Sequence, residues 1–482
     1  MSVSTLLKRG LVVDGTGRAG YCADVLIEGE FVARIGEIDA NEAERVFDCT
    51  GLVVAPGFID VHTHDDAAAL EKPAMLPKIS QGVTTVIGGN CGISLAPLIT
   101  RTPIEPLGLL GANEFRFSRL SEYADAVNAA RPAVNVAALI GHTSLRAATM
   151  PRFDRPATPS ERARMVEHMR RAMDDGALGL STGIFYENAY AADEAELVEI
   201  ASAAAAGGGV YTTHIRTELE GILEAMEEAA RVTRRSGLPL VFSHHKCCGP
   251  ENWGRTRETL ARIDAWATHQ PIGMDVYPYT AGSTVLREDL VDGVIDILIT
   301  GSEPHPEMAG MRLADIAALW GVDQREACRR LAPGGACYFQ MHEEDVQRVL
   351  AHPRTMIGSD GLPLDPRPHP RLWGAFPRVL GRYCRELGLL PLESTIFKMT
   401  GLPAAQFRLG KRGTLAAGHP ADITVFDPRR IRDRATFDDP EQTSEGIRHV
   451  FVNGALSYEE GSAAAPYPRN GKFIRLQESD VR

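Results

Sequence analysis

Two histidines one residue apart, His62 and His64, follow an apolar stretch at residues 58–61. The stretch consists mostly of strand-forming residues, and Pro56-Gly57 interrupts the apolar run just before it. Because alternate side chains of a strand point to the same face, the two imidazoles are expected to point the same way. Imidazole is the commonest metal ligand, so the pair is a candidate metal site, with a chance pair at a strand end as the alternative.

Further residues of ligand or catalytic type stand directly after other apolar stretches. They are Asn90-Cys91-Gly92 after residues 84–88, His142 after 135–140, His214 after 210–213, His244-His245-Lys246 after 239–242, and Ser359-Asp360-Gly361 after 355–357. One histidine alone is a weak signal. Six candidate ligands at five strand ends are too many to attribute to chance.

The elements that must position these residues are eight apolar stretches that read as strands. They lie at residues 58–61, 84–88, 135–140, 178–180, 210–213, 239–242, 273–276 and 355–357. Helices are expected at 159–175, where Thr158 is the N-cap, and at 193–206 and 218–236. Eight strands with helical crossovers predict an α/β fold, a closed parallel (β/α)8 TIM barrel. The C-terminal strand ends of such a barrel meet at one mouth, where distant residues converge on one site.

Both ends of the chain alternate polar and apolar residues between Gly/Asp turns, which is typical of antiparallel strands. This pattern predicts one small β domain formed from both termini, and the family resemblance given below implies that this domain is a β-sandwich. We expect residues 1–57 and 409–482 to form this domain and residues 58–408 to form the catalytic barrel. The gap from about 281 to 335 is too long for a plain loop, so we interpret it as an insertion or lid.

The composition is that of an ordinary globular protein, with 482 residues, 44% apolar residues and a net charge of −12. The negative charge argues against nucleic-acid binding, and no apolar run reaches the ~18 residues of a membrane helix. The N-terminus lacks the long apolar core of a signal peptide, so a cytoplasmic protein is expected. The eight cysteines have no spacing typical of a disulfide scaffold, and most of them should be free thiols in that compartment. The sequence indicates no oligomeric state.

A site made of imidazoles, a thiolate and a carboxylate suits zinc. Zinc with an open position lowers the pKa of bound water towards ~7 and polarises a carbonyl. A carboxylate beside that water can take its proton and later deliver it to a leaving amine. This combination predicts an enzyme that hydrolyses an amide.

Some of these residues also have a plainer interpretation. Cys91 alone is more often a small buried hydrophobe, and His142 can merely orient a neighbour. His244 and His245 are adjacent, so one should face the barrel and the other the helix layer. Adjacent cysteines rarely close a disulfide because of its geometry, so Cys247 and Cys248 are expected to be two ordinary thiols.

Several motifs together resemble the amidohydrolase superfamily: Phe58-Ile-Asp-Val-His62-Thr-His64, His214, His244, Asp360 and the tail Gly413-Thr-Leu-Ala-Ala-Gly-His-Pro-Ala-Asp-Ile-Thr-Val-Phe-Asp. Within it, the chain resembles the N-acyl-D-amino-acid deacylases (D-aminoacylases). The specific matches are Gly88-Gly-Asn-Cys91-Gly, Thr213-His214-Ile-Arg-Thr-Glu, Ser243-His244-His245-Lys246, Tyr277-Pro-Tyr-Thr-Ala-Gly-Ser283-Thr and His369-Pro-Arg371-Leu-Trp-Gly. The resemblance covers essentially the whole chain. It implies hydrolysis of N-acyl-D-amino acids to a carboxylate and a free D-amino acid.

The resemblance also implies roles for individual residues. Cys91, His214 and His244 would hold a tightly bound zinc. His62, His64 and Asp360, with Cys91 as a bridge, would form a second site of weak or optional occupancy. Asp360 would act as the general base and then as the acid. The residues expected to bind the α-carboxylate of the substrate are Lys246, Tyr277, Ser283 and Arg371, whose donors suit a carboxylate.

The side-chain preference stays open at this stage, because Arg287 can pair with an acidic substrate side chain or lie at the surface. A hydrolase of cyclic amides or isoaspartyl dipeptides is an alternative of the same scaffold. Such a relative should carry a carboxylated lysine on strand four, whereas this strand leads to Ser181-Thr-Gly. A non-catalytic structural relative is the other alternative, and it should have lost metal ligands that are all present here.

Overall fold

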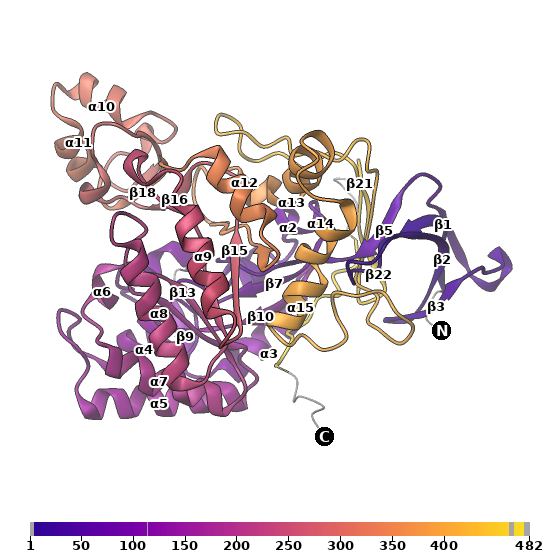
Figure 1. Cartoon of the computed structure of the whole chain (residues 1–482), viewed down its shortest axis with the longest axis horizontal. Helices are drawn as coiled ribbons and strands as arrows, with labels where there is room; N and C mark the ends of the chain where they lie inside the picture. The colour runs from indigo at the N-terminus through magenta and orange to yellow at the C-terminus, as the bar shows by residue number, and fades with distance from the viewer. Residues whose placement is uncertain (1–3, 113, 462–466, 477–482) are drawn as a thin grey trace.

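The computed structural model describes residues 4–112, 114–461 and 467–476. At its centre is a closed ring of parallel strands (Figure 1). The strands are β6 (Phe58–Asp60), β7 (Val83–Gly88), β10 (Asn135–Ala138) continued by β11 (Ile140–Gly141), β12 (Gly179–Gly183), β13 (Val210–His214), β14 (Leu240–Phe242), β15 (Ile272–Val276) and β19 (Thr355–Ile357). A parallel bridge between Thr63 and Gly361 joins the exit of the last strand to that of the first. The predicted eight-stranded barrel is confirmed.

The barrel strands are buried on both faces, which explains why they read as continuous apolar runs. Alternate residues of one strand belong to different apolar clusters. In β14, Val241 packs in one cluster with Ile87 and Met356, whereas Leu240 and Phe242 pack in the larger cluster that includes the surrounding helices. This alternation separates a barrel interior from an outer core between strands and helices.

The helices that surround the barrel lie in the connections between strands. The longer ones are α3 (Leu120–Ala130), α4 (His142–Thr149), α5 (Pro159–Asp174), α7 (Glu194–Ala206), α8 (Ile222–Ser236), α9 (Thr256–Trp266), α12 (Glu343–Ala351), α13 (Arg371–Arg378) and α14 (Leu392–Met399). Thr158 caps α5 as predicted, since its side chain accepts from the backbone N–H of Glu161. The helix predicted from residue 218 begins only at Ile222. Residues 218–221 instead form a turn that carries the Glu218 carboxylate to the barrel mouth.

Both termini contribute to one antiparallel-rich sheet at the end of the molecule where indigo and yellow strands lie side by side (Figure 1). Its strand order is β22 (Ala455–Glu459), β21 (Ile447–Val452), β20 (Ile423–Phe426), β5 (Val53–Pro56), β1 (Thr5–Val12), β2 (Tyr21–Glu28) and β3 (Phe31–Gly36), with β4 (Arg45–Asp48) also paired to β1. The two ends of the chain meet where β20 pairs with β5. The sheet is therefore continuous and branches at β1, and a small apolar cluster with members from both termini packs against it.

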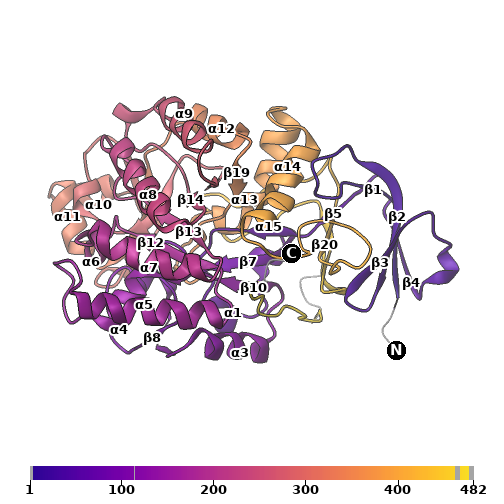
Figure 2. The ribbon, with the colours of Figure 1, turned by 60° about the horizontal axis from the view of Figure 1, so that its bottom comes forward.

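The segment expected as an insertion has its own sheet and core. Strands β16 (Gly282–Val285), β18 (Gly334–Phe339) and β17 (Asp296–Ser302) pair antiparallel, and α10 (Leu313–Trp320) and α11 (Gln324–Leu331) pack on them. Figure 2 shows these helices at the opposite end of the molecule from the terminal sheet. A lid function for this segment stays a prediction.

Within the described part of the chain, no helix has the length and apolar character needed to cross a membrane. All eight cysteines are free thiols.

His142 opens α4 but takes part in a structural ion cluster. Its Nε2 lies 2.8 Å from Glu196 Oε1, and Arg146 Nη1 lies 2.6 Å from the same oxygen. All three side chains are fully buried. Burial raises the pKa of Glu196, but His142 and Arg146 outweigh it and lower the pKa to about 2. His142 therefore orients the neighbouring Glu196 carboxylate, which is the plainer of the two interpretations given for this histidine.

Replacing Glu196 should destabilise the fold without altering the chemistry. Glu196→Leu leaves Arg146 buried without its carboxylate, which costs about 3–5 kcal/mol. The free energy of unfolding from urea titration should fall by that amount, while kcat per folded molecule stays unchanged. Glu199→Leu is the matched control on α7, because Glu199 forms a half-exposed ion pair with Arg162 whose loss costs at most about 1 kcal/mol. Equal destabilisation by the two variants would contradict a special role for the buried cluster.

Candidate active site

The candidate ligands lie just beyond the C-terminal ends of the barrel strands, and three of them have strained backbones. Cys91, His244 and Asp360 have positive φ angles of 51°, 36° and 48°. Non-glycine residues in this region cost about 1–3 kcal/mol each, so their surroundings must hold them there. The His244 N–H donates to Asp275 Oδ1 at 2.8 Å, and the Asp360 N–H donates to the His62 carbonyl at 2.7 Å. Strain of this kind is concentrated at functional sites.

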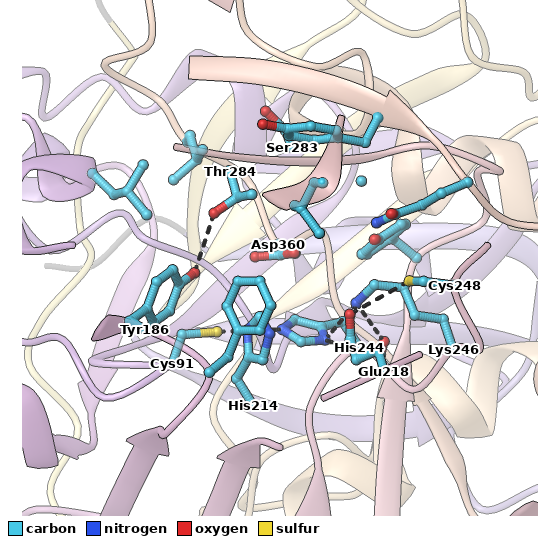
Figure 3. A pocket seen from close by; sticks show the side chains of 18 of the residues that line it. Cys91, Tyr186, His214, Glu218, His244, Lys246, Cys248, Ser283, Thr284 and Asp360 are labelled. Atoms are coloured by element: carbon cyan, nitrogen blue, oxygen red, sulfur yellow. Dashed lines mark hydrogen bonds and ion pairs between the residues drawn. The ribbon is translucent and has the colours of Figure 1, made fainter. Parts of the chain in front are cut away.

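A first group of metal-type donors consists of Cys91, His214 and His244. The Sγ of Cys91 lies 3.4 Å from Nε2 of His244, which lies 3.1 Å from Nδ1 of His214. Figure 3 shows the three side chains next to one another. Ligand bonds of 2.0–2.3 Å in a tetrahedron put neighbouring donor atoms about 3.3–3.8 Å apart. The observed spacings are close to these values, so this group fits a zinc ion.

A second group consists of His62, His64, Asp360 and again Cys91. His62 Nε2 is 3.2 Å from Cys91 Sγ and 3.5 Å from Asp360 Oδ1, and His64 Nε2 is 3.3 Å from the same oxygen. All four side chains are buried. Cys91 thus belongs to both groups, and its sulfur is the atom that links them.

The charges in this buried site favour a cation. Burial raises the pKa of the Cys91 thiol, but the imidazoles of His62 and His244 outweigh it and hold the pKa well below its ordinary value. Burial likewise raises the pKa of Asp360, yet Arg371 and His62 bring it well below the usual range. A thiolate and a carboxylate therefore lie among the imidazoles of this site. Such a donor set is typical of zinc.

Two carboxylates that we did not predict from the sequence orient the ligands. Asp275, in β15, lies 3.2 Å from Nδ1 of His62 and also accepts from the His244 backbone. Glu218 Oε1 lies 3.1 Å from Nδ1 of His244. Carboxylates on the outer nitrogen of ligating imidazoles fix the ring orientation. The available signals were an acidic residue within the apolar stretch 273–276 and the glutamate that ends the motif after His214.

Ser181 stands on β12, where a carboxylated lysine would lie in many amidohydrolases. Its Oγ donates to the Gly89 carbonyl and accepts from the Gly92 N–H at 3.1 Å. The hydroxyl therefore supports the loop that carries Cys91 on both sides. Its role in the barrel is structural.

Three of the four residues expected to bind a carboxylate lie around one cavity, and Lys246 among them contacts His244. Lys246, Tyr277 and Ser283 line this cavity together with members of both metal-type groups. Lys246 Nζ is 2.6 Å from Glu218 Oε1 and 2.9 Å from His244 Nδ1, as Figure 3 shows. Arg371 does not line the cavity. Its guanidinium packs over the Tyr277 ring at 4.4 Å, and its Nη1 is 2.9 Å from Asp360 Oδ2, an ion pair without hydrogen-bond geometry.

Arg287 lies outside this cavity, in an adjoining groove. It forms a two-pronged ion pair with Asp289 at 2.9 and 2.5 Å. It also donates to the Phe185 carbonyl at 3.1 Å and packs 4.0 Å from the centre of that ring. Phe185 in turn stacks on His214 and lines the cavity. No signal in the sequence indicated this role of Phe185. Arg287 is therefore committed to partners within the chain.

The neighbouring residues of the His244 motif follow the predicted alternation. His245 points to the helix layer, where its Nε2 lies 2.7 Å from Thr259 Oγ1 of α9. Burial lowers the pKa of His245 to about 4, so it stays neutral. Cys247 and Cys248 are buried thiols, and burial raises the pKa of both. None of the three belongs to either metal-type group among the described residues.

Comparisons with known proteins agree with the motifs and the geometry. The amidohydrolase family model matches residues 45–319 and 312–458. D-aminoacylase of Alcaligenes xylosoxydans xylosoxydans is 50% identical over 456 residues, which make up 94% of each chain. A solved D-aminoacylase, studied for its binuclear metal centre with one-metal activation and second-metal attenuation, is 48% identical with a TM-score of 0.95.

A second solved structure is the N-acyl-D-glutamate deacylase of Bordetella bronchiseptica, complexed with zinc and a phosphonate that mimics the tetrahedral intermediate. It is 45% identical with a TM-score of 0.95, and both structures cover 98% of this chain and 100% of their own. These matches confirm the resemblance inferred from the motifs. The chain belongs to the amidohydrolase family and, within it, to the group of the N-acyl-D-amino-acid deacylases.

Proposed function

We propose that this protein is a zinc-dependent enzyme that hydrolyses the amide bond of N-acyl-D-amino acids. The observation that carries the proposal is the buried Cys91 sulfur, which belongs to both metal-type groups. Asp360 is a member of the second group, and donors that suit a carboxylate line the same cavity. The substrate class follows from the D-aminoacylase and the N-acyl-D-glutamate deacylase that the chain resembles over nearly its full length. The products are a carboxylate and a free D-amino acid.

Cys91, His214 and His244 would hold the tightly bound zinc, because a thiolate and two imidazoles form a complete three-ligand set with one open position. His62, His64 and Asp360, together with Cys91, would form the second site. Weak or optional occupancy of this site agrees with the one-metal activation and second-metal attenuation of the related D-aminoacylase. Bound zinc supplies a Lewis acid that lowers the pKa of water and polarises the amide carbonyl.

Asp360 is the residue we assign to proton transfer. Its carboxylate is ionised, since its pKa lies well below the usual range despite burial, and it lines the cavity. It would take a proton from the water that attacks the carbonyl carbon and deliver that proton to the amide nitrogen as the C–N bond breaks. His64 and Arg371 hold the two carboxylate oxygens in place at 3.3 and 2.9 Å.

The α-carboxylate of the substrate would bind on the Lys246 side of the cavity. The Lys246 ammonium lines the cavity and forms an ion pair with Glu218. Burial alone would lower the pKa of Lys246, but the Glu218 carboxylate outweighs burial and raises that pKa, so the ammonium stays charged. The buried Ser283 hydroxyl has no hydrogen-bond partner among the described residues, which leaves it free to donate to a ligand. Tyr277 lies between the Lys246 and Arg371 cations, 5.8 and 4.4 Å from its ring centre. Cations and hydroxyl donors of this kind recognise a carboxylate.

The cytoplasm, the compartment expected from the sequence, suits this chemistry. A bridging thiolate functions only while it is reduced, and all eight cysteines are free thiols.

The reaction is tested by amine release from paired N-acetyl-D- and N-acetyl-L-leucine, with and without a zinc chelator. We expect release from the D substrate alone, abolished by the chelator and restored by zinc. Release from the L substrate, or chelator-resistant release, would contradict the proposal. No release from either substrate by protein that contains zinc would assign the site to another amide.

Asp360→Asn should remove turnover and leave the first zinc bound. Loss of a general base typically lowers kcat by about 10²–10⁴-fold, and Cys91, His214 and His244 do not need this carboxylate. The measurements are kcat and zinc content of the purified variant. Asp365→Asn is the control, because Asp365 lies in the same segment and outside both ligand groups. A variant Asp360→Asn with near-normal kcat would overturn the base assignment.

A preference for apolar substrate side chains is expected, because Leu109, Leu219, Leu290 and Leu362 line the cavity and Arg287 is bound to Asp289. N-acetyl-D-leucine should therefore have a higher kcat/KM than N-acetyl-D-glutamate. Arg287→Ala should leave the ratio of the two kcat/KM values unchanged. A selective loss on the glutamate substrate would instead show that Arg287 turns to an acidic side chain when that substrate binds.

A further inference from the structure

A fully buried lysine lies behind the second ligand group. Lys78 is in the short helix α2 (Leu76–Ile79), and its side chain has no exposed surface. Its Nζ is 2.8 Å from Asp60 Oδ2, 2.8 Å from Thr63 Oγ1 and 2.7 Å from Ser359 Oγ. A second carboxylate, Asp65, lies 3.2 Å away. The ammonium group therefore has a complete set of partners, and it does not line the cavity.

The partners of Lys78 come from the two strand exits that carry the second ligand group. Asp60 and Thr63 belong to the exit of β6, which continues to His64, and Ser359 belongs to the exit of β19. Thr63 lies between His62 and His64 in the chain, and Ser359 directly precedes Asp360. His62, His64 and Asp360 are therefore each adjacent in the chain to a residue that accepts a hydrogen bond from the Lys78 ammonium.

Backbone contacts join the same two exits. The Asp360 N–H donates to the His62 carbonyl at 2.7 Å, and the His64 N–H donates to the Gly361 carbonyl at 3.1 Å. Asp60 Oδ1 accepts from the Ser359 N–H at 2.8 Å and from the His62 N–H at 3.3 Å. Lys78 therefore supports a junction in which the spacing of His62, His64 and Asp360 is set by a few hydrogen bonds.

The charge of Lys78 is maintained in this position. Burial lowers the pKa of the ammonium, but Asp60 and Asp65 outweigh it and raise the pKa above its ordinary value. A buried ion pair contributes little to the free energy of unfolding compared with apolar side chains of similar size. The contribution of the Lys78 ion pairs is therefore expected to lie in fixing the positions of the two strand exits.

The first ligand group is supported by other contacts. Cys91 and His244 follow β7 and β14, and His214 is the last residue of β13. Ser181 supports the Cys91 loop, and Glu218 and Asp275 orient His244. No hydrogen bond or ion pair joins Lys78 to any of these three ligands in the described chain. A change at Lys78 is therefore expected to act on one group and spare the other.

We propose that Lys78 is a positioning residue for the second metal site: by joining the exits of β6 and β19, it sets the spacing of His62, His64 and Asp360 and thereby the affinity for the second cation. The inference rests on the two-site assignment in the proposed function. It does not depend on the identity of the substrate.

The test is metal binding by Lys78→Met, which keeps the length of the side chain and removes the charge. Metal-free protein is titrated with zinc against a competing chelator, and with cobalt while the thiolate-to-cobalt absorption band is recorded. Loss of an outer partner of metal ligands typically lowers affinity by about 10–100-fold. We expect this loss for the second equivalent of metal, with the affinity of the first equivalent and its cobalt band unchanged.

Lys398→Met is the matched control. Lys398 is also buried, and its ammonium donates to backbone carbonyls of His352 and Thr355 at the opposite end of β19. It should leave both metal affinities unchanged. Equal loss of both equivalents in Lys78→Met, or an unchanged second equivalent, would overturn the proposal. So would the same second-site loss in Lys398→Met.

Ser359→Ala keeps the proposal testable if Lys78→Met does not fold. It removes the hydrogen bond from the ammonium to the β19 exit, together with the bonds of the Ser359 hydroxyl to the Gly361 N–H and the His62 carbonyl. All three bonds lie at this junction, so the second equivalent should again be the one that weakens. Binding is measured without substrate, so failure of the deacylase reaction leaves this test intact. Wild-type protein that binds two metals yet does not release amine would count against the proposed function alone.

Discussion

The rest of the site depends on the contacts that the Cys91 thiolate makes with the histidines of both ligand groups. Its sulfur lies 3.2 Å from Nε2 of His62 and 3.4 Å from Nε2 of His244, so it touches both ligand groups. A buried anion is costly unless cations or hydrogen-bond donors surround it. The imidazoles, the metal that they suit and the Arg371 guanidinium provide that compensation. Removal of the sulfur would leave the two groups without a shared ligand atom.

The barrel supplies the geometry that this thiolate needs. Five strand exits contribute six ligand atoms, and no single exit holds a complete set. Three supports fix four of these exits: Ser181 for the Cys91 loop, Asp275 for His244, and the Lys78 junction for the exits of β6 and β19. The positive φ angles of Cys91, His244 and Asp360 are maintained by these contacts. The stability of the barrel thus holds the strained ligand positions in place.

The sequence predicted the barrel well because its eight strands are buried on both faces and read as short apolar runs. It also predicted the ligand types, since each stands directly after such a run. The beginning of α8 was predicted four residues early, because the helical pattern does not reveal that Glu218 belongs to the site. Asp275 and Lys78 were missed for a physical reason: their partners lie 213 and 281 positions away, and no local pattern reports such a contact. The division of the ligands into two groups came from resemblance, since spacing along the chain cannot assign it.

X-ray absorption at the zinc edge shows directly whether the Cys91 sulfur is a ligand of both zinc ions, as the proposed two-site assignment requires. A Zn–S distance of about 2.3 Å identifies the thiolate as a ligand. Protein loaded with one zinc should show one sulfur per zinc. Because the same sulfur would bind both ions, protein loaded with two zincs should still show one sulfur per zinc on average. A fall to half a sulfur per zinc would place the second ion away from Cys91, and no sulfur in either sample would exclude the thiolate as a ligand.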